Sequence, residues 1–406
     1  MGDAESVRGS GFVERTRVDE AREILRQETS VAGTETVPLE AADGRVLAEP
    51  VTSPRNVPDF PRAAMDGYAV RAEDTFGAAD RSPAVLSVHE DAPGVEQATW
   101  VHTGSPVPEP ADAVIKTEYA TEVGDSVELT RAVAVGQNVS DVGEDLEAGQ
   151  HLFDPGHRLR PSDLALLRSV EIESVEVRTR PAVAVIPTGE ELVESDPDPG
   201  EAIETNGIMV ASLVERWGGE ATHREVVTDD WDALADAIEA DLDADLIVTT
   251  GGSSIGKRDL LPAVVEEIGE LLVHGVGLKP GHPVALGQVE GTPVLMLPGY
   301  PVACIVNAWQ FVRPALNWAA GTTPAEPSRV QARLDRKIRS EPGIRSCVRV
   351  TTEGSGEDVT ASPVHESGAS ILSSVSLADG WVQVPESIEG YDAGETVTVE
   401  FWEAVP

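Results

Sequence analysis

The spacing of apolar residues changes along the chain from helical to strand-like. Residues 18–28 carry apolar side chains at helical spacing, which predicts a short helix. From about Thr52 to Gly149, short apolar segments alternate with turn residues, and this pattern is typical of a β-rich region. Residues 150–178 combine turn signals with a second short helix over 162–170, and this stretch could pair back with the first segment.

The clearest pattern begins at Pro181, where strand-like and helix-like segments alternate strictly. The predicted order is strand 182–187, helix 206–219, strand 223–228, helix 230–242 and strand 245–250. Such alternation predicts a doubly wound α/β domain with a parallel sheet. Two more apolar segments follow at 284–289 and 293–299, and a long helix is expected over 301–320.

The last part of the chain returns to short strands. The segment 322–328 is rich in Thr and Pro and is interpreted as a linker. Five strand-like segments between 331 and 402 then predict a small β domain. No internal repeat is evident in the sequence.

Charge adds one strong constraint. The chain of 406 residues has 30 basic and 71 acidic side chains, a net charge of −41. A chain this acidic repels nucleic acid and anionic membranes, so neither is expected as a partner. Only four of the basic residues are lysines, and dense carboxylates with few lysines indicate a high-salt cytoplasm. Most of this charge is expected to keep the surface hydrated rather than to act in catalysis.

The remaining composition excludes several other classes. Cys304 and Cys347 are far apart in the sequence, which supports neither a zinc knuckle nor a disulfide scaffold. The first eleven residues are polar, and no run of 18 or more apolar residues occurs. We therefore expect a cytoplasmic protein in a reducing environment.

The segment 249–259 (TTGGSSIGKRD) has the strongest chemical signal. It follows a buried strand and precedes a helix, where ligands bind in open parallel sheets. Small residues there let backbone N–H groups surround a phosphate, and the expected cradle is Gly251, Gly252, Ser253 and Ser254. The alternative is a tight turn that needs glycine for its shape alone. Arg258 stands where a P-loop requires Ser or Thr, so the NTPase hypothesis is rejected.

Two further segments belong to the same predicted sheet. The turn 187–192 carries Glu190 and Glu191, and it is expected to reach the same crevice as the glycine-rich turn. The segment 277–283 (GLKPGHP) places Lys279 and His282 three residues apart. Lys279 could neutralise a bound oxyanion, although a lysine in a loop is equally often a surface residue, and His282 alone is more often structural.

The β-rich region offers isolated carboxylates. Asp66 lies in the apolar segment 61–70, where it is either a turn residue or a site residue. The segment 138–149 contains Asp141, Glu144 and Asp145, whose oxygens could hold Mg²⁺ or could simply be solvated in so acidic a chain.

Seven motifs taken together carry a resemblance that none of them carries alone. In chain order they lie at 64–70, 102–118, 138–149, 187–192, 249–259, 278–283 and 297–302. This series resembles the MoeA family, the molybdopterin molybdenumtransferases related to the gephyrin E domain. The acidic, lysine-poor composition is similar to that of a halophilic archaeal member.

The resemblance implies the domain organisation and the reaction. It implies an elongated homodimer whose chain has a composite N-terminal domain (12–52 and 148–178), a β-rich inserted domain (53–147), a molybdopterin-binding α/β domain (179–323) and a C-terminal β domain (328–406). The implied reaction inserts molybdate or tungstate into adenylylated molybdopterin and releases AMP, with Mg²⁺ as cofactor. The implied active cleft lies between the α/β domain and the β-rich domain of the other subunit. A molybdopterin adenylyltransferase and apo-molybdoenzymes are implied partners.

The resemblance also assigns residues. The family's site carboxylates, which could ligate Mg²⁺ or position water, fall on Asp66, Asp145, Glu191, Asp229 and Asp259, with Thr103 beside them. The expected cofactor-binding residues are Thr188, Gly189, Gly251, Gly252, Ser253, Ser254, Lys279, His282, Pro298, Pro301, Arg349 and Ser367. Lys279, His282, Arg349 and Ser367 would face the oxyanion.

Two positions depart from the family pattern. The family often has Lys where His282 stands and Asn where Tyr300 stands. If oxyanion capture uses His282, activity should fall as the pH rises through the pKa of that histidine.

Three other functions are kept as alternatives. A molybdopterin adenylyltransferase-like enzyme would use a similar α/β domain but would not need the β-rich half. A non-catalytic dimeric scaffold of the same fold would not need the carboxylates. A nucleotide-processing protein that shares only the α/β domain would lack the N-terminal motifs.

Overall fold

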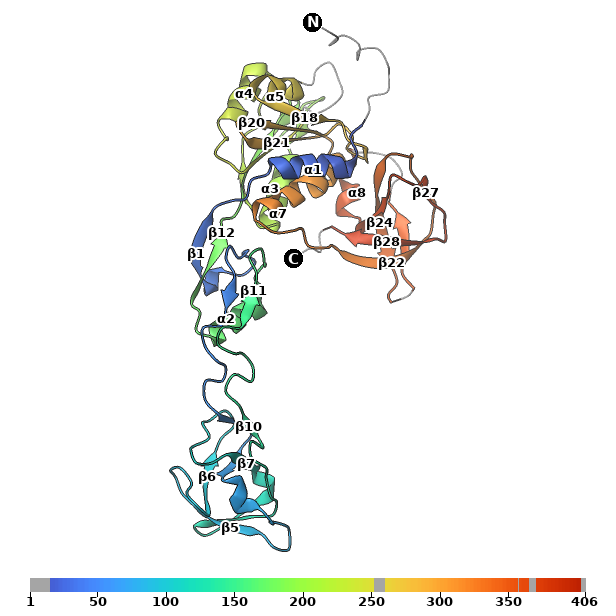
Figure 1. Cartoon of the computed structure of the whole chain (residues 1–406). Helices are drawn as coiled ribbons and strands as arrows, with labels where there is room; N and C mark the ends of the chain where they lie inside the picture. The colour runs from blue at the N-terminus through green and yellow to red at the C-terminus, as the bar shows by residue number, and fades with distance from the viewer. Residues whose placement is uncertain (1–14, 252–259, 357, 365–369, 403–406) are drawn as a thin grey trace. The chain divides into compact units, whose positions relative to one another are not determined.

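The computed structural model describes residues 15–251, 260–356, 358–364 and 370–402 (Figure 1). The chain divides into two compact units. The larger unit contains residues up to 35, residues 44–48 and residues from 177 onward. The smaller unit contains residues 36–43 and 49–176.

A six-stranded sheet forms the centre of the larger unit. Its strand order is β16 (Glu220–His223), β13 (Ala182–Pro187), β17 (Leu246–Thr250), β21 (Thr292–Leu297), β20 (Ala285–Val289) and β18 (Glu270–His274). The first four strands are parallel, as expected from the strand–helix alternation. Strands β20 and β18 run antiparallel to their neighbours. For β20 the reason is the two-residue turn at Glu290 and Gly291, both with positive φ, which joins β20 to β21 and is too short for a parallel crossover.

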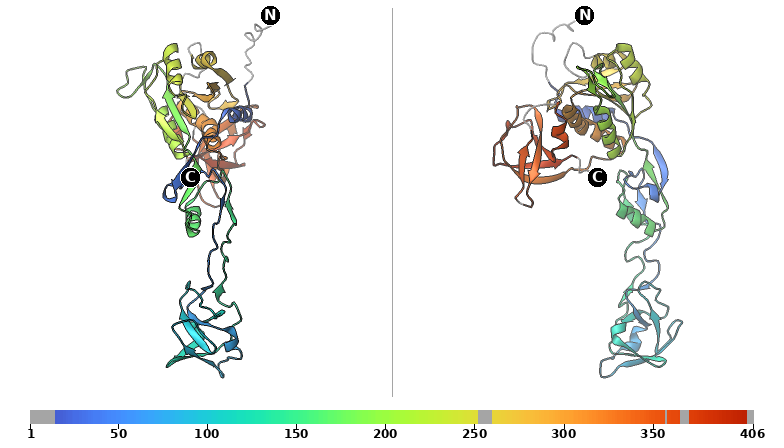
Figure 2. Two further views of the ribbon diagram at one scale, coloured as in Figure 1. Left: turned by 60° about the vertical axis from the view of Figure 1, so that its left-hand side comes forward. Right: turned by 180° about the vertical axis from the view of Figure 1, so that it is seen from behind.

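Helices cover both faces of this sheet (Figures 1 and 2). On one face α4 (Trp231–Glu239) and α5 (Leu261–Ile268) pack against alternate strand residues such as Ala184 and Ile186. On the other face Val183 and Val185 meet α1 (Val18–Glu28), α3 (Asn206–Arg216), α6 (Pro301–Asn307) and α7 (Arg313–Ala319). Burial on both faces explains why the central strands are continuously apolar.

Two sequence-based expectations change in detail. The strand expected over 223–228 ends at His223, and the chain then runs towards α4 with Arg224 N–H donating to the Val185 carbonyl. The helix expected over 301–320 is continuous but includes the π-helical segment η4 (Ala308–Val312) between α6 and α7. The helix expected over 18–28 is α1, which belongs to the larger unit.

The C-terminal part of the larger unit is a small barrel. Its strands are β22 (Ser328–Leu334), β24 (Arg345–Glu353), β25 (Thr360–Pro363), β26 (Gly380–Val384) and β28 (Thr396–Phe401). The pairing of β24 with β26 closes the sheet around an apolar core. The remaining elements here are β23 (Ile338–Arg339), β27 (Gly390–Tyr391) and α8 (Ser373–Ser376). The short strand β19 (Leu278–Lys279) pairs with the start of β24.

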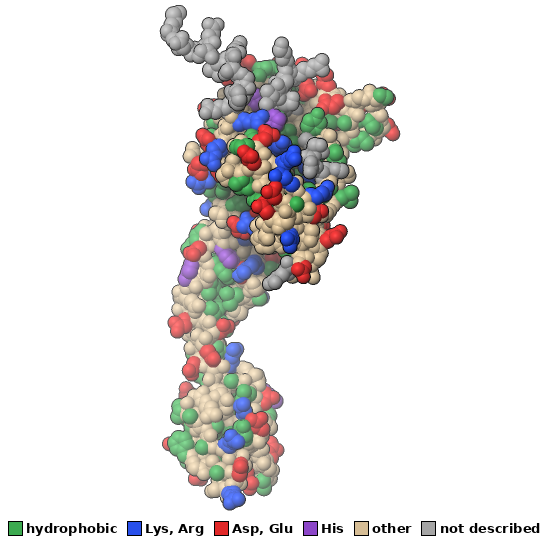
Figure 3. Space-filling view, turned by 90° about the vertical axis from the view of Figure 1, so that its right-hand side faces the viewer, with side chains coloured by type: hydrophobic (Ala, Val, Ile, Leu, Met, Phe, Trp, Pro, Cys, Tyr) green, Lys and Arg blue, Asp and Glu red, His purple; other side chains and the backbone are tan. Residues whose placement is uncertain are grey.

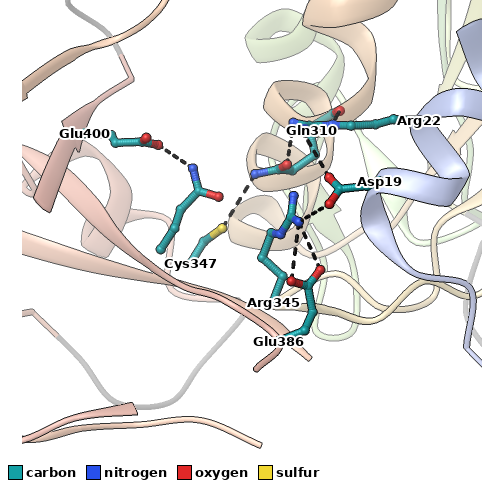
Figure 4. A network of polar contacts seen from close by, with 8 residues as sticks. Asp19, Arg22, Gln310, Arg345, Cys347, Glu386 and Glu400 are labelled. Carbon is teal, nitrogen blue, oxygen red and sulfur yellow. Dashed lines mark hydrogen bonds and ion pairs between the residues drawn. The ribbon is translucent and has the colours of Figure 1, made fainter. Parts of the chain in front are cut away.

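Polar and aromatic contacts join this barrel to the helices (Figure 4). Arg345, on β24, contacts Asp19 on α1 at 2.8 Å and Glu386 at 3.0 Å. Four tryptophan rings follow one another at centroid distances of 6.2, 5.4 and 4.7 Å, in the order Trp217, Trp309, Trp381 and Trp402. The barrel and the α/β sheet therefore share one core.

The smaller unit contains a second six-stranded sheet. Its order is β7 (Ala113–Lys116), β4 (Gly67–Val70), β6 (Gln97–Val101), β5 (Ala84–Val88), β9 (Ser126–Leu129) and β8 (Ala120–Val123). Strands β4 and β8 were not expected from the apolar pattern. Gly67 is the first residue of β4. Glycine is required there because a Cβ would lie 2.0 Å from the Ile115 carbonyl oxygen.

The remaining elements are short. They are β1 (Thr34–Pro38), β2 (Val51–Thr52), β3 (Arg62–Ala63), β10 (Val139–Ser140), β11 (His151–Phe153), α2 (Pro161–Ser169), β12 (Ser174–Arg178), β14 (Leu192–Val193) and β15 (Ala202–Ile203), with 3₁₀ turns η1 (Leu39–Ala41), η2 (Ala72–Thr75) and η3 (Thr117–Tyr119). Strand β1 pairs with β12, β2 with β11, β3 with β10 and β14 with β15. The helix expected over 162–170 is α2.

Cys304 and Cys347 are both free and buried, which agrees with the expectation of no disulfide. Among the residues described, no helix is long and apolar enough to cross a membrane.

Candidate functional site

The ends of β13 and β17 bring two predicted turns together. Thr188 follows β13, and Gly251 follows β17 with its N–H donating to the Leu297 carbonyl at 3.0 Å. Gly251 has a φ of 148°, and a Cβ there would lie 2.1 Å from the Thr188 carbonyl oxygen. Only glycine fits this approach. Gly252, Ser253 and Ser254, which were expected to continue the cradle, lie outside the described residues.

Buried polar atoms without partners surround this point. Within the described part of the chain, Thr188 Oγ1, Thr250 Oγ1 and Asn206 Oδ1 make no hydrogen bond, and each residue is more than nine-tenths buried. Asn206 Nδ2 donates to the Gly299 carbonyl at 2.7 Å, which places the start of α3 beside the turn before α6. Buried polar groups are nearly always satisfied, so this edge of the sheet is suited to a polar ligand.

A pair of carboxylates lies next to the Thr188 turn. Gly189 N–H donates to the Val227 carbonyl, so residues 227–229 run beside the turn. A Cβ on Gly189 would lie 3.0 Å from Glu191 Oε2, which shows that the Glu191 side chain folds back over this glycine. Burial, then the nearby charge of Glu191, raises the pKa of Asp229. These two carboxylates are therefore neighbours that repel one another.

Glu191 and Asp229 have the chemistry of cation ligands. Two carboxylates are suitable ligands for Mg²⁺, and a cation would offset their mutual repulsion. Nowhere in the described residues do three or more His, Cys, Asp or Glu side chains gather as a metal-binding group. Asp259, the third carboxylate expected in this part of the chain, lies outside the described residues.

Asp66 lies in the smaller unit and is held by Thr103. The Thr103 N–H and hydroxyl donate to Asp66 Oδ1 at 2.7 and 2.8 Å. These two hydrogen bonds, the backbone one first, lower the pKa of this exposed carboxyl. Asp66 is therefore an oriented, ionised side chain on the surface.

Asp145 also lies in the smaller unit and is exposed. Its N–H donates to the Val57 carbonyl at 2.9 Å, and its carboxylate faces solvent. Asp141, Glu144 and Asp145 do not gather into a metal-binding group among the described residues.

The segment 278–283 is held from several sides. Asn307 Nδ2, on α6, donates to the Gly281 carbonyl at 3.1 Å, and a Cβ on Gly281 would lie 2.1 Å from that nitrogen. Lys279 Nζ contacts Glu341 Oε1 at 3.0 Å. Burial, then the charge of Arg15, lowers the pKa of His282. His282 therefore gains its proton at a lower pH than an ordinary histidine, whose pKa is near 6.5.

Three other expected residues are placed as follows. Arg349, on β24, is 5% exposed, and its Nε has no hydrogen-bond partner in the described structure. Burial lowers the pKa of its guanidinium. Pro298 follows β21 and Pro301 begins α6, where a missing N–H costs little. Ser367 lies outside the described residues. On the surface, Lys and Arg side chains gather over one face of the larger unit (Figure 3).

Comparison with known proteins identifies the family. Three family models match in series: the MoeA N-terminal region (domain I and II) over 16–170, the "Probable molybdopterin binding domain" over 184–318 and the MoeA C-terminal region (domain IV) over 331–402. The chain is 34% identical to molybdopterin molybdenumtransferase 2 of Mycobacterium tuberculosis, covering 90% of this chain and 94% of that protein. The chain belongs to the MoeA family.

Further relatives agree. Molybdopterin molybdenumtransferase of Bacillus subtilis is 33% identical, with 94% of this chain and 93% of that protein covered. The crystal structure of a molybdopterin biosynthesis MoeA protein from Pyrococcus horikoshii is 36% identical and superposes with a TM-score of 0.83, over 96% of this chain and 99% of that one. The family and the multidomain fold expected from the seven motifs are thus confirmed.

Sequence reasoning did not name two of the buried polar residues at this edge of the sheet. Thr250 and Asn206 stand at the end of a strand and the start of a helix. A usable signal existed for Asn206, since Asn is frequent at helix starts, but nothing in the sequence indicated that it reaches Gly299. The expected carboxylates are divided between units, with Asp66 and Asp145 in the smaller and Glu191 and Asp229 in the larger.

Proposed function

We propose that this chain inserts molybdate, or tungstate, into adenylylated molybdopterin and releases AMP. Its relatives of 33–34% identity over nearly the whole chain are named molybdopterin molybdenumtransferases, and this observation carries the proposal. An adenylyltransferase would require only the α/β domain, whereas all three MoeA family models match this chain. A pure scaffold would not need a pair of repelling carboxylates beside an unsatisfied polar edge.

In this proposal the edge formed by β13 and β17 binds the pterin phosphate. Thr188 Oγ1 and Thr250 Oγ1 can donate to phosphate oxygens, and Gly251 lets the backbone approach closely. Asn206 Oδ1 is an acceptor, suited to an N–H of the pterin ring. A ligand that forms hydrogen bonds with these buried atoms offsets the free-energy cost of their desolvation.

Glu191 and Asp229 are proposed to hold Mg²⁺. The ion would neutralise charge on the phosphoanhydride between molybdopterin and AMP. Asp66, ionised and oriented by Thr103, is proposed to position the water that cleaves this bond. Water adds to phosphorus, the anhydride oxygen leaves with AMP, and the water's proton passes to a carboxylate. Molybdenum then bonds to both dithiolene sulfurs, and the two thiol protons leave with one molybdate oxygen as water.

We further propose a homodimer whose site combines Glu191 and Asp229 of one chain with Asp66 of the other. The same proposal includes the domain division stated above, a cytoplasmic location and a requirement for high salt. It also includes exchange of substrate and product with a molybdopterin adenylyltransferase and with apo-molybdoenzymes. Asp145 and Asp259 are retained in it as candidate Mg²⁺ ligands, and Ser367 as an oxyanion contact.

A subunit-mixing experiment tests this arrangement. Asp66→Asn and Glu191→Gln should each abolish AMP release. After the two inactive proteins are unfolded and refolded together, random pairing should restore about one quarter of wild-type activity, since each heterodimer regains one intact site. A site built within one chain would regain none.

The reaction itself is tested by AMP release in molar KCl from adenylylated molybdopterin with Mg²⁺ and molybdate or tungstate. We expect AMP release to depend on the oxyanion and the product to reconstitute an apo-molybdoenzyme. Pterin binding without AMP release under any oxyanion would contradict the proposal and favour the scaffold.

A further inference from the structure

The N-terminal segment pairs with residues 275–277, which lead into the loop 278–283, where the family resemblance expects Lys279 and His282 to face the oxyanion. Thr16 N–H donates to the Gly275 carbonyl at 3.2 Å, and Gly277 N–H donates to the Thr16 carbonyl at 2.9 Å. Val276, bridged to Thr16, donates its own N–H to the His282 carbonyl at 2.9 Å. Three stretches of chain are thus joined side by side by backbone hydrogen bonds.

This arrangement carries Arg15 to the loop from a distant part of the sequence. Arg15 is exposed, and it forms no ion pair with any residue of the described structure. Its charge acts on His282, and it also acts, after Lys279, on Glu341. Arg15 therefore belongs to the same group of charges as Lys279, His282 and Glu341.

The two basic residues of the loop itself do not supply a free positive charge. Lys279 is paired with Glu341 at 3.0 Å. Burial and the charge of Arg15 lower the pKa of His282, so the imidazole is neutral at pH 7 and above. An arginine guanidinium remains protonated throughout this range. Of Arg15, Lys279 and His282, Arg15 is the permanently charged group that forms no ion pair among the described residues.

We propose that Arg15, on the N-terminal segment, is an oxyanion-binding residue that supplies the permanent positive charge of the loop 278–283. This inference rests on the proposed function for the identity of the anion, molybdate or tungstate. It assigns to the segment before α1 a role in the site, in addition to its backbone pairing.

Equilibrium dialysis with molybdate alone, followed by metal analysis, tests the proposal without any pterin. At pH 7.5, Arg15→Gln should weaken molybdate binding about fivefold or more, and Arg15→Lys should restore most of it. Arg26→Gln is the matched control, because it removes the same charge from an exposed arginine on α1 that is paired with Glu23. The control should bind molybdate as the wild type does.

The pH dependence separates a direct charge effect from a loss of structure. Removing the positive charge of Arg15 should raise the pKa of His282. In Arg15→Gln, molybdate binding should therefore improve on acidification from pH 8.5 to pH 6, beginning at a higher pH than in the wild type. Adding His282→Gln to Arg15→Gln should abolish this improvement.

Two results would overturn the proposal. The first is that Arg15→Gln binds molybdate with the same affinity and pH dependence as the wild type. The second is that the wild type binds no molybdate. If Arg15→Gln weakens binding but the wild type releases no AMP from adenylylated molybdopterin, the proposed reaction fails while the oxyanion site stands. If AMP release depends on molybdate but Arg15→Gln binds normally, the reaction stands and the role of Arg15 is rejected.

Discussion

Arg22 and Gln310 form two hydrogen bonds although they are 288 positions apart in the chain. Arg22 Nε donates to the Gln310 carbonyl at 2.8 Å, and Nη2 donates to Gln310 Oε1 at 2.6 Å. Gln310 lies in the π-helical segment η4, and its Nε2 contacts Cys347 Sγ on β24 at 3.8 Å (Figure 4). A π-helical turn weakens the regular helix ladder, and Arg22 provides a donor for the carbonyl at this point.

Arg22→Ala should therefore destabilise the protein. The substitution leaves two acceptors of the fully buried Gln310 without these donors, which should lower the free energy of unfolding by about 2 kcal/mol. Chemical denaturation of the wild type and the variant measures this difference. Arg26→Ala, on the exposed side of the same helix, should change stability by less than about 0.5 kcal/mol. Equal effects of the two substitutions would show that the Gln310 contact contributes nothing specific.

Thr103→Val should shift the acidic limit of activity. Thr103 lowers the pKa of Asp66 through two hydrogen bonds, and valine removes the hydroxyl while keeping the backbone one. The pKa of Asp66 should rise towards its ordinary value, so AMP release should be lost at a higher pH as the solution is acidified. The pH profile of AMP release gives the shift. Thr103→Ser, which keeps the hydroxyl, should follow the wild-type profile.

Glu191→Gln should lower the pKa of Asp229. Burial raises that pKa first and the charge of Glu191 adds to it, so removing this charge leaves burial as the main effect that raises it. A raised carboxyl pKa in the folded state disfavours folding above the ordinary pKa. The variant should accordingly have a higher melting temperature than the wild type at pH 7, while it binds Mg²⁺ more weakly. A lower melting temperature would mean that the two carboxylates do not repel one another.

Gly281→Ala should destabilise the loop that carries Lys279 and His282. Gly281 has a φ of 117°, and its new Cβ would meet Asn307 Nδ2, whose hydrogen bonds to the Gly281 and Ala303 carbonyls would be disturbed. Gly291→Ala is the control, because φ is 90° there but no atom lies within 4 Å of the new Cβ. The control should lose about 1 kcal/mol from strained backbone, and Gly281→Ala about 2 kcal/mol more from the clash. Denaturation curves of both variants test the difference, which should vanish if Asn307 can move freely.

Much of the architecture could be predicted from the sequence because it depends on local pattern. Helix α1 follows from the spacing of Val18, Ala21 and Leu25, which are its buried residues. The strand–helix alternation after Pro181 predicted the parallel part of the central sheet. The antiparallel direction of β20 was not predicted, because it depends on a two-residue turn whose effect an apolar pattern does not record.

The family likewise follows from the sequence alone, since seven short motifs in a fixed order are informative together even where each is weak. Composition determined the acidic surface and the absence of a disulfide framework. These are properties of residue types and their order along the chain.

Only the tertiary structure decided which side chains meet. Asn206 reaches Gly299, Glu191 faces Asp229, Lys279 pairs with Glu341, and Arg15 approaches His282. In the first, third and fourth of these pairs the partners lie more than 60 positions apart in the chain. Sheet pairing and core packing bring them together, and no periodicity or motif spacing encodes such a meeting. The charge of the proposed oxyanion loop is therefore a property of the fold, because its carboxylate and its uncompensated arginine come from outside the motif.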